Sequence, residues 1–157
     1  MSKFRIHTGI GHTETAIVEA IVDCIKKYGR IPLTESEEMT LRNSIEIHET
    51  PVNLYGYKND KRQEKANIVL RRNSVNRYLS KSDSNDIGFQ CDEKTGEYIA
   101  HISDYDKLTW FDQAEERFYS YAAAWEAREK AELSGLYESI DWQEEGEKIL
   151  LYCHASS

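Results

Sequence analysis

Apolar and polar residues alternate in several short stretches of the chain, and in longer stretches apolar residues recur every three or four positions. Alternation with a period of two is typical of half-buried strands, whereas the longer spacing is typical of an amphipathic helix. The stretches that predict strands are 3–10, 45–57, 66–72, 86–91, 97–102, 139–142 and 148–153. The stretches that predict helices are 13–28 and 109–134, and residues 34–43 fit either a short helix or an ordered loop.

The predicted order of elements is β-α-β-β-β-β-α-β, with one more strand if residues 139–153 form a hairpin and not one interrupted strand. Without one central hairpin this order is βαββαβ, the ferredoxin-like order. We therefore predict an α+β fold, with a mainly antiparallel sheet and two helices on one face. A length of 157 residues fits a single α+β domain over 1–157. We expect the functional site on the other sheet face or in a loop.

Turn and capping residues mark the ends of these elements. Thr13 is a suitable N-cap for the first helix, and Gly29 is a suitable C-cap. Pro51 lacks a backbone donor, so it predicts an edge strand or a bulge. Residues 73–85 are rich in Ser and Asn, which is typical of a loop, and we expect this segment to be the most mobile.

The charge of the chain restricts the partners that it can bind. A formal net charge of −8 argues against a nucleic-acid backbone, because phosphate binding needs a basic face. The central part is nevertheless basic, which indicates either a binding patch or a strand edge protected by cations. These basic residues are Lys58, Lys61, Arg62, Lys65, Arg71, Arg72, Arg77 and Lys81.

Cysteine usage and the apolar runs bear on the compartment. Three widely spaced cysteines, Cys24, Cys91 and Cys153, lie in apolar runs and predict buried free thiols in a reducing cytosol. The first residues contain no apolar segment of the kind that a secretory signal needs, and no run approaches the length of a membrane span. We therefore expect a cytoplasmic protein with no membrane contact.

The central stretch carries a set of ordered sequence features. They are a Gly-Tyr step, a strand rich in Ala, Val and Ile, an Asp-Ile-Gly-Phe box, a strand ending near an aspartate, an aromatic turn and a helix with a Tyr-Ala step. In this chain they correspond to Gly56-Tyr57, 66–72, Asp86-Ile87-Gly88-Phe89, Tyr98 to Asp104, Trp110-Phe111 and Tyr121-Ala122. Over roughly residues 52–135 this pattern resembles the reading-frame-thirty-five proteins of plastids and cyanobacteria, a domain of unknown function that also occurs in phages.

The resemblance implies a soluble intracellular protein and supplies no catalytic residues, because the biochemical role of that family is not established. Its phage members suggest one specific role, an inhibitor of a host factor. No residue of this chain indicates that role directly.

Several residues of the central stretch could bind a small, nucleotide-like anion. Arg71 and Arg72 lie at the end of a predicted strand, and a guanidinium can hold a phosphate or carboxylate through two parallel hydrogen bonds. Tyr55 and Tyr57 share one strand face and could stack on a ring. Asp86 and His101 complete the candidate ligand-binding set. The alternative is surface ion pairing, and Arg71 and Arg72 should point to opposite faces if both lie in one strand.

Other arrangements of reactive residues have weaker support. A zinc site would need His7, His48 and His101 on one face, but the chain has no HExxH or CxxC motif. Cys91 and His101 are predicted on opposite faces of one hairpin, which argues against a thiolate–imidazole pair. We therefore predict no catalytic residues, no metal ligands and no cofactor.

Aromatic residues of the last helix predict a partner surface. Trp110, Tyr119 and Tyr137 fall outside its apolar stripe, and exposed aromatic side chains often anchor protein interfaces, including homo-oligomers. Trp110 and Tyr119 are the predicted partner-binding residues. The leading hypothesis is a non-enzymatic protein that binds a protein partner or sequesters a small anion. The alternatives are an enzyme acting on a phosphorylated small molecule, and a structural or assembly subunit.

Overall fold

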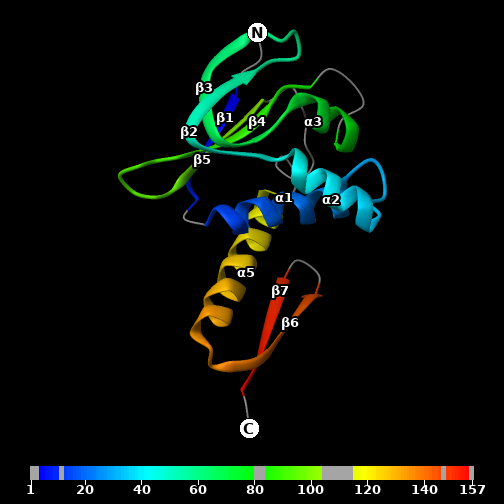
Figure 1. The fold of residues 1–157 in the computed structure, drawn as a ribbon, viewed down its shortest axis with the longest axis vertical. Coiled ribbons are helices and arrows are strands. Elements are labelled where there is room, and N and C mark those ends of the chain that lie inside the picture. The colour runs from blue at the N-terminus through cyan, green and yellow to red at the C-terminus, as the bar shows by residue number, and fades with distance from the viewer. Residues whose placement is uncertain (1–3, 11–12, 80–83, 104–114, 146–147, 156–157) are drawn as a thin grey trace.

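The computed structural model describes residues 4–10, 13–79, 84–103, 115–145 and 148–155 (Figure 1). The helices are α1 (Glu14–Tyr28), α2 (Glu35–Ser44), α3 (Arg72–Tyr78) and α5 (Glu115–Ser134). The strands are β1 (Phe4–Ile10), β2 (Glu46–Tyr55), β3 (Lys61–Leu70), β4 (Ile87–Cys91), β5 (Tyr98–Ser103), β6 (Tyr137–Glu145) and β7 (Lys148–Ala155). The predicted α+β class is confirmed.

The main sheet has five strands in the order β1-β5-β4-β3-β2, and every neighbouring pair is antiparallel. Strands β2 to β5 are neighbours in chain order, as consecutive strands commonly are, although the connection from β3 to β4 contains α3. Strand β1 adds beside β5, so α1 and α2 connect the two opposite edges of the sheet. The finer prediction of a ferredoxin-like order with an inserted hairpin is not confirmed.

The main core lies between one face of this sheet and the helices. Ile17, Ile21 and Ile25 recur every four residues along α1 and are buried. They belong to the same cluster as Phe89 of β4, whose ring stacks on Phe118 of α5 at a centroid distance of 5.4 Å. The predicted caps of α1 are confirmed: the Thr13 side chain accepts a hydrogen bond from the Ala16 N–H, and Gly29 follows the helix.

The opposite face of the sheet carries a smaller apolar cluster, formed by Leu54, Ala66 and Val69. These side chains pack over Gly88, where an added Cβ would lie 2.5 Å from the Ala66 Cβ. A side chain at position 88 would therefore displace β2 and β3 from β4. Strand β2 forms an edge of the sheet, and its register shifts between Ile47 and Val52, as Pro51 predicts.

The predicted loop at 73–85 is wrong in its first part, because residues 72–78 form the helix α3. Two of its side chains, Val75 and Tyr78, are buried in the main core. The backbone of Arg30 donates a hydrogen bond to the Tyr78 carbonyl, and the Arg30 side chain donates to the Asn76 carbonyl. Tertiary contacts therefore stabilise a helix that is too short to form by intrinsic propensity. The segment 34–43 is also helical, as α2, so the described residues contain four helices and not two.

The last helix and the final hairpin extend from the body on the side of α1 opposite to the sheet (Figure 1). We call α5, β6 and β7 the arm. The strands β6 and β7 pair only with each other among the described residues, so the predicted hairpin is confirmed. The hairpin packs on α5 through Trp142, whose ring lies 5.1 Å from that of Trp125. Cys153 of β7 is exposed, which corrects the prediction of a buried thiol; Cys24 is buried and Cys91 is half-buried.

Candidate functional site

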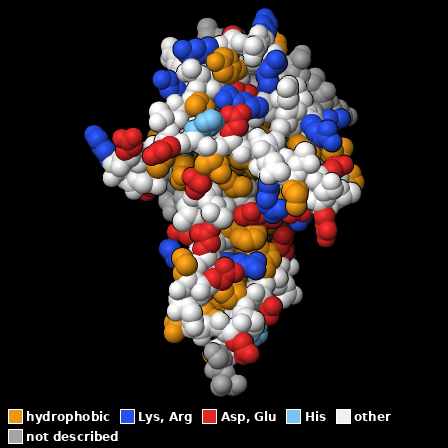
Figure 2. Space-filling view, in the orientation of Figure 1, with side chains coloured by type: hydrophobic (Ala, Val, Ile, Leu, Met, Phe, Trp, Pro, Cys, Tyr) orange, Lys and Arg blue, Asp and Glu red, His pale blue; other side chains and the backbone are white. Residues whose placement is uncertain are grey.

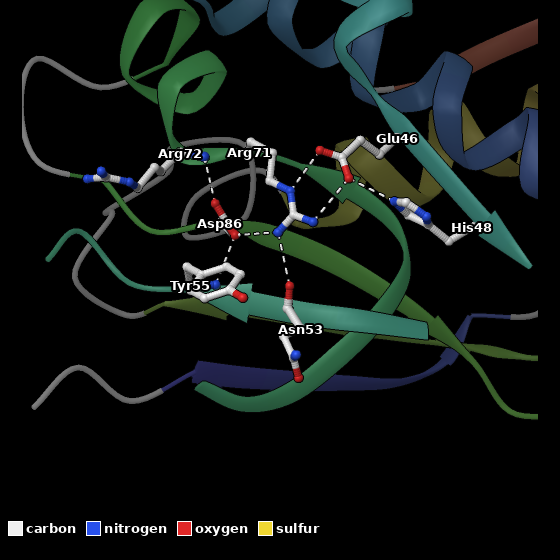
Figure 3. A network of polar contacts seen from close by, with 7 residues as sticks. All are labelled: Glu46, His48, Asn53, Tyr55, Arg71, Arg72 and Asp86. Atoms are coloured by element: carbon white, nitrogen blue, oxygen red, sulfur yellow. Dashed lines mark hydrogen bonds and ion pairs between the residues drawn. The ribbon is translucent and has the colours of Figure 1, made fainter. Parts of the chain in front are cut away.

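Arg71 lies at the junction of β3 and α3 and is the centre of a polar network (Figure 3). Its Nε donates to Glu46 Oε2 at 2.7 Å, and its Nη2 donates to Glu46 Oε1 at 3.0 Å. Its Nη1 donates to Asp86 Oδ2 at 2.8 Å and to the Asn53 carbonyl at 2.9 Å. A guanidinium has five N–H groups, so these contacts occupy four of them.

Asp86 is the buried partner in this network, with a relative exposure of 1%. Besides Arg71, its carboxylate accepts hydrogen bonds from the Arg72 N–H at 2.7 Å and from the Tyr55 N–H at 2.8 Å. Its own backbone N–H donates to the Tyr55 carbonyl at 2.9 Å. The side chain therefore connects the end of β2, the start of α3 and the residue before β4. A buried carboxylate with three donors is satisfied without a ligand.

The electrostatics of the network do not favour an anion. The hydrogen bond from Arg71 lowers the pKa of Glu46, and the same contact raises the pKa of Arg71. Both groups are therefore charged at neutral pH, and the guanidinium faces the carboxylates of Glu46 and Asp86 together. His48 lies beside Glu46, with its Nε2 2.7 Å from Oε1. Because two carboxylates surround one guanidinium, an incoming phosphate would meet an excess of negative charge.

The structure brings together five of the six predicted ligand-binding residues, but not in the predicted way. Arg71 and Arg72 do not alternate along a strand, because Arg71 precedes α3 and Arg72 is its first residue. The Arg72 side chain points away from the network and donates to the Tyr57 carbonyl (Figure 3). The Arg71 guanidinium lies 5.9 Å from the Tyr55 ring centre, while Tyr57 is exposed beside Lys58. The five residues form a structural junction.

His101, the sixth predicted residue, lies in β5 opposite Gly88 and is buried. Its Nε2 lies 3.1 Å from Gln90 Oε1, and its Nδ1 has no hydrogen-bond partner. Burial lowers the pKa of His101, so the imidazole is neutral at pH 7. The hydrogen bond of His101 goes to Gln90, which is not a member of the Arg71 network.

The other histidine and cysteine arrangements do not form a reactive centre in the described part of the chain. His48 and His101 lie in strands separated by β3 and β4, and the described residues contain no group of three or more metal-ligating side chains. The register of β4 and β5 places Cys91 opposite Tyr98 and His101 opposite Gly88, so the two point to opposite faces, as predicted. The side chain of His7 and all of His12 lie outside the described residues.

Sequence reasoning missed three members of the network: Glu46, His48 and Asn53. Glu46 and His48 alternate with apolar residues in β2, a pattern that places them on the polar face without naming a partner. The contact of Asn53 uses its backbone carbonyl, which any residue could supply. Only Glu46 carries a sequence signal, since it is an acidic residue in a strand that could approach a basic one.

The predicted partner-binding residues have different outcomes. Trp110 lies outside the described residues. Tyr119 is half-buried, packs against the main core and lies 5.7 Å from the Phe118 ring. It therefore offers less free surface than the helix pattern predicts.

An apolar surface occurs instead at the turn between α5 and β6. Leu133, Leu136 and Tyr137 lie within five consecutive residues and have relative exposures of 87%, 67% and 39%. We call these three residues the apolar tip. Leu133 and Leu136 flank the end of α5 near Gly135, where apolar residues often pack together over a helix cap, yet both remain exposed. On the side of the molecule that Figure 2 shows, hydrophobic and acidic side chains are interspersed over the surface of the arm.

The comparisons with known proteins find no match to this chain among protein-family models, curated proteins or solved structures. The resemblance over residues 52–135 therefore stays a prediction. None of the helices in the described ranges combines the length and the apolar character that a transmembrane helix requires.

Proposed function

We propose that this chain is a non-enzymatic binding protein that engages a protein partner through the apolar tip. The observation that carries the proposal is the exposure of Leu133 and Leu136 beside Tyr137. Large apolar side chains normally lose most of their exposure on folding, and a group of them left exposed is typical of an interaction site. Tyr137 adds a ring with a polar end, a side chain that is frequent at the centre of interfaces.

The arm holds the tip away from the body by specific contacts. Near the base of the arm, Trp125 Nε1 donates to Asp23 Oδ2 of α1 at 2.6 Å. The hydroxyl of Tyr121 donates to Glu144 of β6 at 2.8 Å, and Lys27 of α1 forms an ion pair with the same carboxylate at 3.1 Å. A preorganised tip loses less conformational entropy when a partner binds than a flexible loop would.

The residues around the tip indicate the chemistry of the partner. Glu132 precedes Leu133, and Glu138 follows Tyr137. A complementary surface would have an apolar pocket for the leucines and cationic side chains around it. Such a pocket is a property of a folded protein, which is why a protein is preferred here to a small anion. The four hydrogen bonds that Arg71 donates within the protein also weigh against the anion-sequestering alternative.

The test is affinity capture of partners with chemical crosslinking, comparing the wild type with the Leu133→Asp/Leu136→Asp double variant. We expect the double variant to lose at least about tenfold in partner retention, the range of an interface hot spot. Met39→Asp is the matched control, because Met39 is also an exposed apolar residue, at 65%, and lies on α2 of the body. Equal retention by the double variant and the wild type would contradict the proposal.

A further inference from the structure

The hairpin of the arm has two edges without a strand partner in the described part of the chain. An open edge presents a row of free N–H and C=O groups, which can pair with a strand of another molecule. Natural proteins protect such edges with charged side chains, bulges or a covering element. The two strands of this hairpin differ in that protection.

Strand β6 is protected by charge, whereas β7 is not. The sequence of β6 contains four acidic residues, which are Glu138, Asp141, Glu144 and Glu145. Strand β7 contains no acidic residue, and its segment 149–153 is Ile-Leu-Leu-Tyr-Cys, without any charge. The side chains of Ile149, Leu150 and Leu151 are half-buried, and Ile149 packs against the main core, whereas Tyr152, at 43%, and Cys153 are exposed.

We propose that the free edge of β7 pairs with β7 of a second copy of this chain, which joins two hairpins into one four-stranded antiparallel sheet. Antiparallel pairing of two identical strands follows a two-fold axis, so each copy donates and accepts the same hydrogen bonds. The proposal goes beyond the proposed function, because it uses a strand edge and not the apolar tip.

Charge explains why the second copy meets β7 and not another surface. Each copy carries a net charge of −8, so two copies repel each other wherever acidic surfaces face. Pairing at β7 brings a neutral strip against a neutral strip and keeps the acidic strand β6 on the far side of each hairpin. An isolated two-stranded hairpin is also only marginally stable in water, so pairing into a four-stranded sheet would stabilise the hairpins of both copies.

The test is the molar mass of the purified full chain by analytical ultracentrifugation, for the wild type and the Leu150→Glu variant. Leu150 lies on the sheet face opposite to Trp142 and Ile149, so a charge there leaves the packing of the hairpin on α5 in place. We expect a dimer for the wild type, and at least a tenfold higher dimer Kd for Leu150→Glu, because each copy then brings a negative charge into the neutral strip of the new strand pair.

The matched control is Gln143→Glu, which adds the same charge at the cross-strand partner of Leu150 on β6. This control should remain a dimer, with the same circular dichroism spectrum as the wild type. A monomeric wild type would overturn the inference, and so would a dimer that Leu150→Glu leaves intact. A dimer that is lost in Leu133→Asp/Leu136→Asp but kept in Leu150→Glu would place the contact at the tip, which also overturns the inference.

The same experiments separate the two proposals. A monomeric wild type that still captures a protein partner through the tip would overturn the β7 pairing and leave the proposed function standing. A dimer that depends on β7 but captures no protein partner would support the β7 pairing and contradict the proposed function. Capture of a different protein that depends on Leu150 would identify a foreign strand on this edge and overturn the pairing of two copies.

Discussion

The Arg71 junction and the apolar tip differ in how far the fold uses the side chains that they contain. The junction is rich in charge, yet Arg71 and Asp86 direct their hydrogen-bonding groups at each other and at the backbone. The tip has no unusual chemistry, yet Leu133 and Leu136 face solvent. This difference shows that charged residues in a cluster do not by themselves indicate a ligand site. What matters is whether the fold leaves their polar groups unused.

The comparison predicts the largest loss of stability at Asp86. Asp86→Ala removes the buried acceptor of three donors and leaves the Arg71 guanidinium partly unpaired, which should reduce the free energy of unfolding by about 3–5 kcal/mol. The measurement is urea denaturation at pH 7. Glu93→Ala, at an exposed position of the β4–β5 turn, is the control and should change stability by less than about 0.5 kcal/mol. A loss below about 1 kcal/mol at Asp86 would mean that the junction is not a structural one.

A smaller and pH-dependent effect is expected at the joint between body and arm. Burial raises the pKa of Asp23 from 3.8 to about 6, although the Trp125 hydrogen bond favours the charged form. The folded protein therefore binds this proton more tightly than the unfolded chain, so stability increases as pH falls from 7 through about 6 towards 4. The gain at low pH is on the order of 2–3 kcal/mol.

The measurement for Asp23 is the free energy of unfolding between pH 7.5 and pH 5, for the wild type and Asp23→Asn. The interval matters, because the lowered pKa of Glu46 removes stability only at lower pH. We expect the wild type to gain stability relative to Asp23→Asn as the solution is acidified. Lys26, Glu19 and Glu144 also act on this carboxyl group and are present in both proteins. Parallel curves for the two proteins would show that Asp23 titrates normally.

The smallest effect on stability is expected at the tip. Leu136→Ala removes an exposed side chain, so the free energy of unfolding should change by less than about 0.5 kcal/mol. Leu54→Ala, at a fully buried leucine of β2, is the comparison and should cost about 2–5 kcal/mol. Thermal unfolding of the two variants gives the contrast directly. A loss at Leu136 similar to that at Leu54 would mean that the tip is part of the core.

The sequence predicts the α+β class, most strands and the helices α1 and α5, because long periodic stretches report which side chains are buried. It does not predict α3, whose seven residues have loop composition and become helical because Val75 and Tyr78 enter the core. It also does not predict the strand order, because periodicity identifies which face of a strand is buried and not which strand lies beside it. The pairing of β1 with β5 depends on contacts across most of the chain.

The sequence identifies two members of the candidate site, Arg71 and Asp86, but it does not predict that they form a structural junction. Arg71 and Asp86 stand out as charged residues at the borders of apolar runs, and they do meet. Glu46, the other carboxylate partner of Arg71, lies before a register shift in β2, so no counting along the strands could place it opposite Arg71. The exposure of Leu133 and Leu136 could not be predicted from the sequence either, because a leucine near a helix end usually packs against the cap.

The position of β1 has a consequence for how the chain acquires its fold. Phe4 pairs with Ser103 and Ile10 with Tyr98, so the first strand finds its neighbour only after roughly a hundred residues have been synthesised. Strands β2 to β5 are neighbours in chain order, so they can pair successively during this time, before β1 has a strand to pair with. We therefore expect the last step of sheet formation to be the addition of β1, the first strand synthesised, to β5, the last strand of the main sheet to be synthesised. Slow closure of that edge would leave β5 open to other chains on the ribosome.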